Sequence, residues 1–235
     1  MLKVDEVCTG YGGVQVLRGA SLSVEGGEFV GLFGPNGHGK TTLLRLISGL
    51  LPVWTGTILF DGGEIKRHSP GPLLRQGLVH VAQGNTLFKK MTVEENLALG
   101  AFASGWRERH QRMDRVFSIF PKLAERRNQL ASTLSGGERQ MVSIGIGLMS
   151  EPKMLMLDEP TLGLAPKIRE ELSHTIRSLA ATGVTLLIVD QDLEFLQMST
   201  QRSYLLEGGR IVLETDLSKE ISDTEILKHY FGSPA

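Results

Sequence analysis

At 235 residues, the chain has room for one large domain, or for one domain with a subdomain. Its composition of 41% hydrophobic and 22% charged residues is that of a globular protein with a sizeable core. The formal net charge of −1 argues against a protein whose main partner is a nucleic-acid backbone, because such domains carry a basic excess. The single cysteine excludes an internal disulfide framework and fits a reducing compartment.

The N-terminal sequence MLKVDEVCTG alternates like a strand and lacks the long apolar segment of a signal peptide. No window approaches the ~20 apolar residues that a membrane-spanning helix needs. If the protein serves a membrane process, we therefore expect it to act from the surface of a partner.

In the first ninety residues, the hydrophobic patterns predict mostly strands. The segment 40–50 is the exception, since its pattern is helical and Gly49 lies near its end. The predicted strands are 2–7, 26–34, 56–62 and 77–83.

The stretch from about 92 to 150 has a mostly helical pattern, rich in Arg and Glu and poor in β-branched runs. Thr92 and Glu95 have the T-x-x-E spacing of a capping box, which predicts a helix over 92–102. We interpret this stretch as a helical insertion.

After this insertion, apolar strands again alternate with helices. The predictions are strands at 153–159 and 185–190, helices at 167–181 and 192–199, a hairpin at 203–214 and a terminal helix near 226–232. Such alternation indicates an α/β fold with a mostly parallel sheet and flanking helices, in which ligands bind at the carboxyl ends of strands. Asp190 is the last residue of one of these strands, and Gln191 and Asp192 follow it directly.

The sequence GPNGHGKTT matches the phosphate-binding pattern G-x-x-x-x-G-K-[ST], between an expected strand and an expected helix. Its glycines let backbone N–H groups turn toward phosphate oxygens, and the helix N-terminus adds partial positive charge. Lys40 provides a cation for the β- and γ-phosphates of ATP, and the Thr41 hydroxyl can ligate Mg²⁺. We expect His38 to be a solvent-facing spacer rather than an acid–base group. The candidate ATP-binding residues of this loop are Gly34, Pro35, Asn36, Gly37, His38, Gly39, Lys40, Thr41 and Thr42.

Two carboxylates follow the apolar strand in MLMLDEP. A P-loop NTPase needs a carboxylate for Mg²⁺ at the end of a neighbouring strand, and Asp158 is in that position. Glu159 comes next and can polarise the attacking water as a general base. The alternative is that both acids only end the strand and begin a turn before Pro160.

Between the phosphate loop and these carboxylates lies LSGGERQ, residues 134–140. With it, nearly the whole chain resembles the ATP-binding subunit of an ATP-binding-cassette (ABC) transporter. The resemblance implies one P-loop NTPase domain over 1–235, with an N-terminal antiparallel β part and a helical subdomain at approximately 92–150. LSGGERQ is similar to the family's signature motif, in which Ser135, Gly136 and Gly137 close over the γ-phosphate held by another subunit. Hydrolysis then requires a dimer, formed with an identical or a paralogous ATPase subunit.

The resemblance assigns further residues. Tyr11 is expected to stack on adenine, unless it is only an aromatic residue of a turn. Gln83 is expected to reach toward Mg²⁺ and the attacking water. Gln191 stands where most of the family has a histidine that contacts the γ-phosphate. Its amide can donate a hydrogen bond to phosphate but, unlike histidine, does not titrate near neutral pH. The alternative is that Gln191 only ends the strand and has no role in the reaction. In the expected dimer-interface loop TLGLAP, the family often has Asp where this chain has Ala165.

Three segments, MTVEENLALGAF, FPKLAERRNQLASTLSGGERQM and LDEPTLGLAP, resemble the ATPases of branched-chain amino-acid uptake systems. That resemblance implies a peripheral subunit on the cytoplasmic face of the membrane. It also implies transmembrane permease partners, contacted by the segment after Gln83, and indirectly a periplasmic or extracellular substrate-binding protein. The chain departs from this group in AQGN at 82–85, where PEGR or PQGR is usual, and in Ile146-Gly147, where Arg-Ala is usual.

Other functions stay open at this point. One is uptake of urea or short amides, and another is a soluble ABC ATPase that acts on ribosomes or DNA. The single cassette, the short insertion and the charge of −1 favour transport without a nucleic-acid partner. A GTPase would need an N-K-x-D element, which the sequence lacks. The sequence does not specify the transported substrate, the direction of transport, the identity of the second ATPase subunit or the role of the C-terminal segment.

Overall fold

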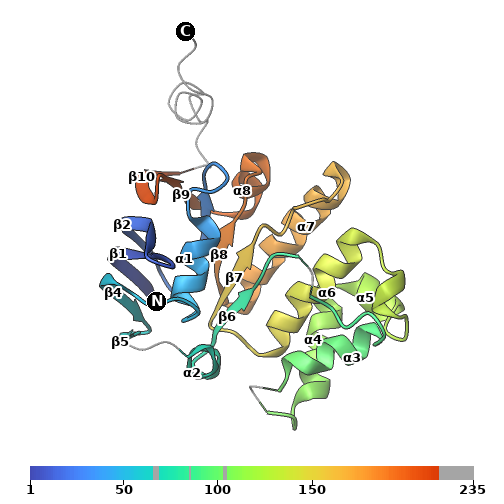
Figure 1. Cartoon of the computed structure of the whole chain (residues 1–235). Helices are drawn as coiled ribbons and strands as arrows, with labels where there is room; N and C mark the ends of the chain where they lie inside the picture. Colours follow the sequence, from blue (N-terminus) through green and yellow to red (C-terminus); the bar gives the residue numbers. More distant parts are fainter. Residues whose placement is uncertain (66–68, 85, 103–104, 217–235) are drawn as a thin grey trace.

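The computed structural model describes residues 1–65, 69–84, 86–102 and 105–216. The terminal helix predicted near 226–232 therefore lies outside the described residues. Figure 1 shows antiparallel strands on one side, a parallel sheet in the middle and a group of helices on the other side.

The antiparallel sheet has the strand order β2-β1-β4-β5. Its strands are β1 (Leu2–Tyr11), β2 (Val14–Val24), β4 (Thr55–Phe60) and β5 (Gly63–Glu64). The sequence pattern does not predict β2, because Gly19 has a φ of 82° and the pairing with β1 shifts register repeatedly, which breaks the alternation.

The second sheet has the order β10-β9-β3-β8-β7-β6, and its pairs are parallel except for the β9–β10 hairpin. This arrangement confirms the predicted fold class. The strands β3, β7 and β8 are buried along their whole length, as their continuous apolar sequences predict. The strands are β3 (Phe29–Phe33), β6 (Leu78–Val81), β7 (Met154–Asp158), β8 (Thr185–Val189), β9 (Arg202–Glu207) and β10 (Arg210–Thr215).

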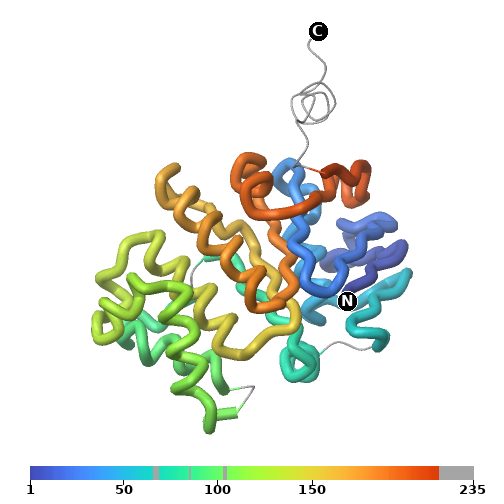
Figure 2. The backbone as a smooth tube through the Cα atoms, turned by 180° about the vertical axis from the view of Figure 1, so that it is seen from behind, coloured from blue at the N-terminus to red at the C-terminus, as the bar shows by residue number. Residues whose placement is uncertain are grey.

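Helices cover both faces of this sheet and form the group on its far side. They are α1 (Lys40–Ile47), α2 (Pro70–Arg75), α3 (Val93–Gly100), α4 (Arg109–Ile119), α5 (Pro121–Glu125), α6 (Gly136–Met149), α7 (Pro166–Ser178) and α8 (Leu193–Ser199), with short 3₁₀ turns at Ala131–Thr133 and Leu179–Thr182. Figures 1 and 2 show α1 on one face of the sheet and α7 and α8 on the other. The predicted capping box of Thr92 and Glu95 is present at the start of α3. The short helix α2 was not predicted.

Two apolar clusters form the core, one on each face of the parallel sheet. The first packs α6, α7 and α8 against side chains such as Phe29 and Ile188. The second fills the space between the parallel sheet, the antiparallel sheet and α1, with side chains such as Val30 and Leu43. Alternate residues of one strand therefore serve different cores, which requires an apolar residue at every position. Within the described part of the chain, no helix is long and apolar enough to span a membrane.

The register of the parallel sheet determines where the polar strand ends meet. Asp158 pairs with Val189, and Leu32 pairs with the same Val189 from the other side. The carboxyl ends of β3, β6, β7 and β8 therefore lie at one edge of the sheet. The phosphate loop, the carboxylates and the two candidate glutamines all follow these ends.

Candidate functional site

The phosphate loop connects β3 to α1 and needs glycine at two positions. Gly34 has a φ of 152°, and a Cβ atom there would lie 2.1 Å from the carbonyl oxygen of Leu206. Gly39 is left-handed, with a φ of 108°, and is the N-cap of α1. The first turn of α1 therefore presents its unpaired N–H groups and its partial positive charge at the loop, as an anion site requires.

Lys40 is buried inside this loop. Its Nζ donates to the carbonyl oxygens of Gly34 at 2.7 Å and Pro35 at 3.1 Å. Burial lowers the pKa of Lys40, while the charges of Glu159 and Asp158 oppose that shift. The ammonium group thus lies within the loop, where a phosphate bound by the loop N–H groups would be in its reach.

Asp158 ends β7 and contacts the phosphate loop directly. Its Oδ1 accepts a hydrogen bond from the Thr41 hydroxyl at 3.1 Å, and only 3% of the residue is exposed. Burial raises the pKa of Asp158 to about 6, and the nearby Glu159 adds to this shift. The buried carboxylate is therefore poorly solvated, and a cation beside it would be strongly favoured.

The raised pKa predicts a stability effect of Asp158. The folded protein binds a proton here up to about pH 6, whereas an unfolded chain loses it near pH 3.8. The contribution of Asp158 to the free energy of unfolding is therefore fully present below pH 3.8, and it is lost as the pH rises through about 6. We expect Asp158→Asn to raise the melting temperature of the nucleotide-free protein by roughly 5 °C near neutral pH.

The measurement is a thermal melt at a series of pH values, and the gain should vanish at about pH 4. Asp61→Asn is the matched control, because Asp61 is exposed and bonded to Lys153. A variant Asp158→Asn that melts below the natural protein near neutral pH would contradict the assigned cost of burying this charge.

Glu159 lies between two glutamine amides. Gln83 Nε2 donates to its Oε2 at 2.7 Å, and Gln191 Nε2 donates to its Oε1 at 2.8 Å. The two glutamines follow β6 and β8, the strands on either side of β7. Glu159 itself has a φ of 46°, a strained conformation for a residue with a Cβ. Both carboxylate oxygens are thereby held in place at the edge of the sheet.

These groups line one cavity of about 420 Å³. Its residues are Asn36, Gly37, Gly39, Lys40, Thr41, Thr42, Gln83, Glu159, Leu162 and Gln191. The phosphate loop, the Lys40 ammonium, the Thr41 hydroxyl and the Glu159 carboxylate thus border a single space, and phosphoryl chemistry uses this set of groups. Hydroxyl, carboxylate and amide oxygens are also the ligands that Mg²⁺ prefers, so the residues present fit that ion.

Tyr11 lies beside α1, and His38 lies within the phosphate loop. The Tyr11 hydroxyl accepts a hydrogen bond from Arg45 of α1 at 3.3 Å, and 41% of the residue is exposed. A ring in this position is available for stacking. His38 Nδ1 accepts from the backbone N–H of Gly208 at 3.2 Å, which gives it a structural contact to the β9–β10 turn.

The signature segment opens α6 and does not line the cavity described above. Ser135 is the N-cap of α6 and forms a capping box with Glu138. Gly137 packs so closely that a Cβ atom would lie 2.5 Å from the side chain of Ile168. Ser135 is exposed and Gly136 is half-buried, so this helix start is open to a ligand from outside its own subunit.

The structure adds contacts that the sequence patterns do not assign. The Asp190 carboxylate is buried and accepts hydrogen bonds from the backbone N–H and the hydroxyl of Thr161. Burial raises the pKa of Asp190. Arg169 of α7 forms an ion pair with Asp192 at 2.6 Å. The sequence does show an acidic residue on each side of Gln191, which indicates polar contacts there. It does not indicate the partners of these two acids, because those partners are 23 or more positions away.

A sequence model of the ABC transporter family matches residues 17–162. The chain belongs to the ABC transporter family. The high-affinity branched-chain amino acid transport ATP-binding protein BraG of Pseudomonas aeruginosa is 40% identical over 99% of this chain and 100% of its own length. The ADP conformation of MJ1267, an ATP-binding cassette of an ABC transporter, has a TM-score of 0.88 at 28% identity and covers 99% of both chains.

A second ABC structure shows the cassette as a dimer. This post-hydrolysis state of MJ0796, bound to ADP and Pi, has a TM-score of 0.80 at 25% identity, over 92% of this chain and 99% of that chain. Together with the family match, these relatives show that this chain is an ABC ATPase that binds and hydrolyses ATP.

Proposed function

We propose that this ABC ATPase hydrolyses ATP with Glu159 as the general base and Gln83 and Gln191 as the groups that orient it. The observation that carries the proposal is the pair of amide contacts on the two oxygens of Glu159. An attacking water gives its proton to Glu159 while its oxygen bonds to the γ-phosphorus, and the bond to ADP breaks. Gln191 then contacts the γ-phosphate through its amide.

We assign the binding of ATP and Mg²⁺ to the phosphate loop and the residues next to it. Residues Gly34 to Thr42 bind the phosphates, with Lys40 at the β- and γ-phosphates, and Tyr11 stacks on adenine. Mg²⁺ would be held by Thr41, Gln83 and Asp158, and it supplies positive charge to the β- and γ-phosphate oxygens. The Thr41–Asp158 contact of 3.1 Å supports this ligand set, since it holds the Asp158 carboxylate against the Thr41 hydroxyl, and Thr41 and Gln83 line the same cavity.

The second half-site comes from another ATPase subunit, identical or paralogous. Ser135, Gly136 and Gly137 at the start of α6 bind the γ-phosphate held by the partner. Their absence from the lining of the cavity of their own subunit supports this division, and so does the dimeric relative. The helices of approximately 92–150 act as the subdomain that carries this motif.

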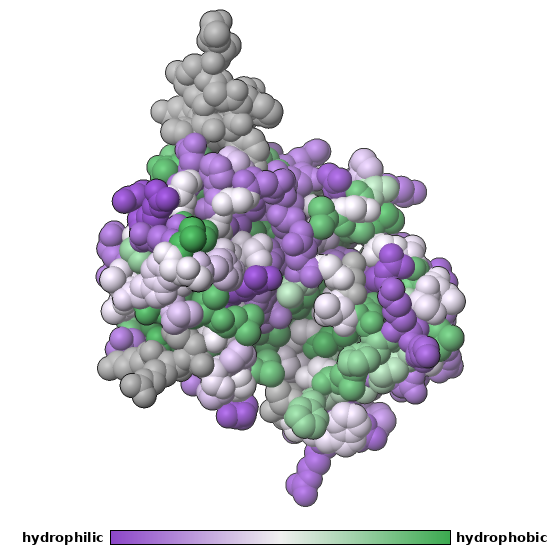
Figure 3. Space-filling view, in the orientation of Figure 1, coloured by the Kyte–Doolittle hydropathy of each residue, from purple (hydrophilic) through white to green (hydrophobic). Residues whose placement is uncertain are grey.

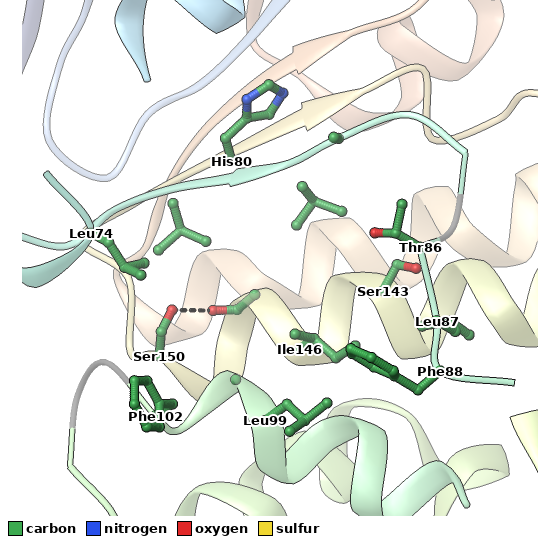
Figure 4. A pocket seen from close by; sticks show the side chains of 15 residues that line it. Leu74, His80, Thr86, Leu87, Phe88, Leu99, Phe102, Ser143, Ile146 and Ser150 are labelled. Atoms are coloured by element: carbon green, nitrogen blue, oxygen red, sulfur yellow. Dashed lines mark hydrogen bonds between the residues drawn. The ribbon is translucent and has the colours of Figure 1, made fainter. Parts of the chain in front are cut away.

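An apolar groove supports a membrane permease as partner. The groove has a volume of about 400 Å³ and lies between the end of β6, the segment after it, α3 and α6. Figure 4 shows Phe88, Leu99 and Ile146 around this space, and Figure 3 shows apolar side chains gathered on that face. Phe88 is 60% exposed and Phe102 is 87% exposed. Such a groove fits an amphipathic helix from a transmembrane subunit, and it supports the proposal that the protein acts at the cytoplasmic face of the membrane.

Uptake of branched-chain amino acids is the transport function that the comparisons favour, through the 40% identity with BraG over the whole chain. The test is reconstitution with permease subunits and a substrate-binding protein that co-purify with this subunit. Labelled leucine should accumulate in vesicles that contain ATP, and labelled urea should not. If only urea or a short amide accumulated, the proposed amino-acid substrate would be wrong, and the protein would belong to a urea or short-amide uptake system.

A variant of the groove tests the permease contact. We expect Phe88→Glu to lower permease-stimulated ATP turnover about tenfold, because a charge replaces an apolar anchor in the centre of the interface. The basal turnover of the isolated subunit should stay within about twofold, since Phe88 does not line the nucleotide cavity. Val212→Glu on β10 is the control, an exposed apolar position away from the groove. Co-purification of Phe88→Glu with the permease at the normal ratio would argue against this surface.

A further inference from the structure

Two segments face each other beside the candidate base. We call residues 161–165 the interface loop and residues 190–192 the glutamine turn. Both line a second cavity of about 520 Å³, together with Glu159 and Arg169. Polar contacts join the two segments beside this cavity.

The first contact between these segments is buried. Thr161 donates through its backbone N–H to Asp190 Oδ2 at 3.1 Å and through its hydroxyl to Oδ1 at 2.8 Å. The backbone N–H groups of Gln191 and Asp192 donate to the same Oδ1, at 2.7 and 3.0 Å. This carboxylate therefore joins the start of the interface loop to the turn that carries Gln191.

The second contact is made by Arg169, one turn into α7. Its Nε donates to the carbonyl oxygen of Leu164 at 2.9 Å, and its Nη1 donates to Asp192 Oδ2 at 2.6 Å. Asp192 Oδ1 accepts from the N–H of Phe195 and so caps α8. A planar guanidinium can make both contacts at once, whereas a lysine ammonium would reach one of them with a single centre of charge.

Between the two contacts, the interface loop has an exposed tip. Leu162 is 59% exposed, and Gly163 is left-handed with a φ of 73°. A subunit that packs on this tip would push on a segment that is fixed at both ends to the glutamine turn. The exposed side chain of Leu162 and the Arg169 contact are therefore the features through which a second subunit on this tip would move the glutamine turn.

We propose that Arg169 is a positioning residue that sets the distance between the interface loop and Gln191, and thereby the orientation of Glu159 when a second subunit binds. This inference rests on the proposed roles of Gln191 and Glu159 and on dimerisation. Arg169 is not among the residues that line the candidate nucleotide cavity. Its effect passes through Asp192 to Gln191, whose amide contacts Glu159 at 2.8 Å.

The test is a double-mutant cycle on ATP turnover of the full-length protein at saturating MgATP. We expect Arg169→Ala to lower kcat about tenfold and to leave KM for ATP within about twofold, because the phosphate loop is untouched. In a Gln191→Ala background, the same change should lower kcat by less than about twofold. Asp192→Asn should behave like Arg169→Ala, since asparagine still caps α8 but no longer pairs with the guanidinium.

Arg169→Lys should give an intermediate kcat, since the ion pair to Asp192 is kept and the contact to Leu164 is lost. Glu171→Ala is the control on the same helix, because Glu171 pairs with Lys122 and is not among the residues that line this cavity. Equal losses from Arg169→Ala in both backgrounds, or a rise in KM with an unchanged kcat, would overturn the inference. A natural protein without ATP turnover would instead count against the proposed function itself.

Discussion

Replacing Glu159 by glutamine should lower ATP turnover at least about 100-fold while ATP binding is retained. General-base catalysis contributes typically 10²–10⁴-fold, and an amide cannot accept the proton of the attacking water. Glutamine has the same shape and the same backbone strain at a φ of 46°, so folding is not expected to change. Nucleotide would then stay bound, and the dimer would persist.

The measurement combines steady-state phosphate release with size-exclusion chromatography in MgATP. The Glu159→Gln variant should elute as a nucleotide-bound dimer, whereas the natural protein should return to monomers as ATP is consumed. Glu171→Gln is the control for a change of charge elsewhere on the surface. If Glu159→Gln hydrolysed ATP at the normal rate, Glu159 would be only the end of a strand and another group would have to accept the proton.

Replacing Lys40 by alanine should weaken ATP binding by roughly 10- to 100-fold, because hydrogen bonds to charged groups contribute about 1.5–3 kcal/mol each. Lys40 is the buried ammonium of the loop, and its Nζ lies within hydrogen-bond distance of two loop carbonyl groups. Its removal leaves the loop N–H groups to hold the phosphates alone.

Titration of a fluorescent ATP analogue into the nucleotide-free protein measures this loss. Lys153→Ala is the matched control, because Lys153 is exposed and is bonded to Asp61. A thermal melt separates the two possible causes of a loss, since a variant that only unfolds would melt at a lower temperature. Unchanged affinity in a folded Lys40→Ala protein would remove this residue from the phosphate site.

Local patterns in the sequence were sufficient for the fold class and for the position of the phosphate loop. The continuous apolar strands around 29–33 and 154–158 are buried on both faces, which predicts a parallel sheet without further information. The pattern from Gly34 to Thr41 predicts a phosphate site by itself, because the glycines that curve the backbone, the helix start and the lysine cation are all close together in the sequence. The roles of Ser135, Gly136 and Gly137 came from resemblance to a family, and those roles stay predictions.

Tertiary structure decided which strand ends meet. Glu159 is 76 positions from Gln83 and 32 positions from Gln191, and only the order β8-β7-β6 brings the two amides onto opposite oxygens of its carboxylate. The strand β2 was not predicted, since its bulges depend on pairing with β1.

The stretch TLLIVDQD illustrates what the sequence determined and what tertiary structure determined. Its sequence determined a buried strand that ends in polar groups, because five consecutive apolar or β-branched residues are stable only between two covered faces. It did not determine the partners of those groups. Asp190 meets Thr161, Gln191 meets Glu159 and Asp192 meets Arg169 only after the sheet has formed. Hydrogen bonds act over about 3 Å in space without regard to separation along the chain, so tertiary structure alone selects these contacts.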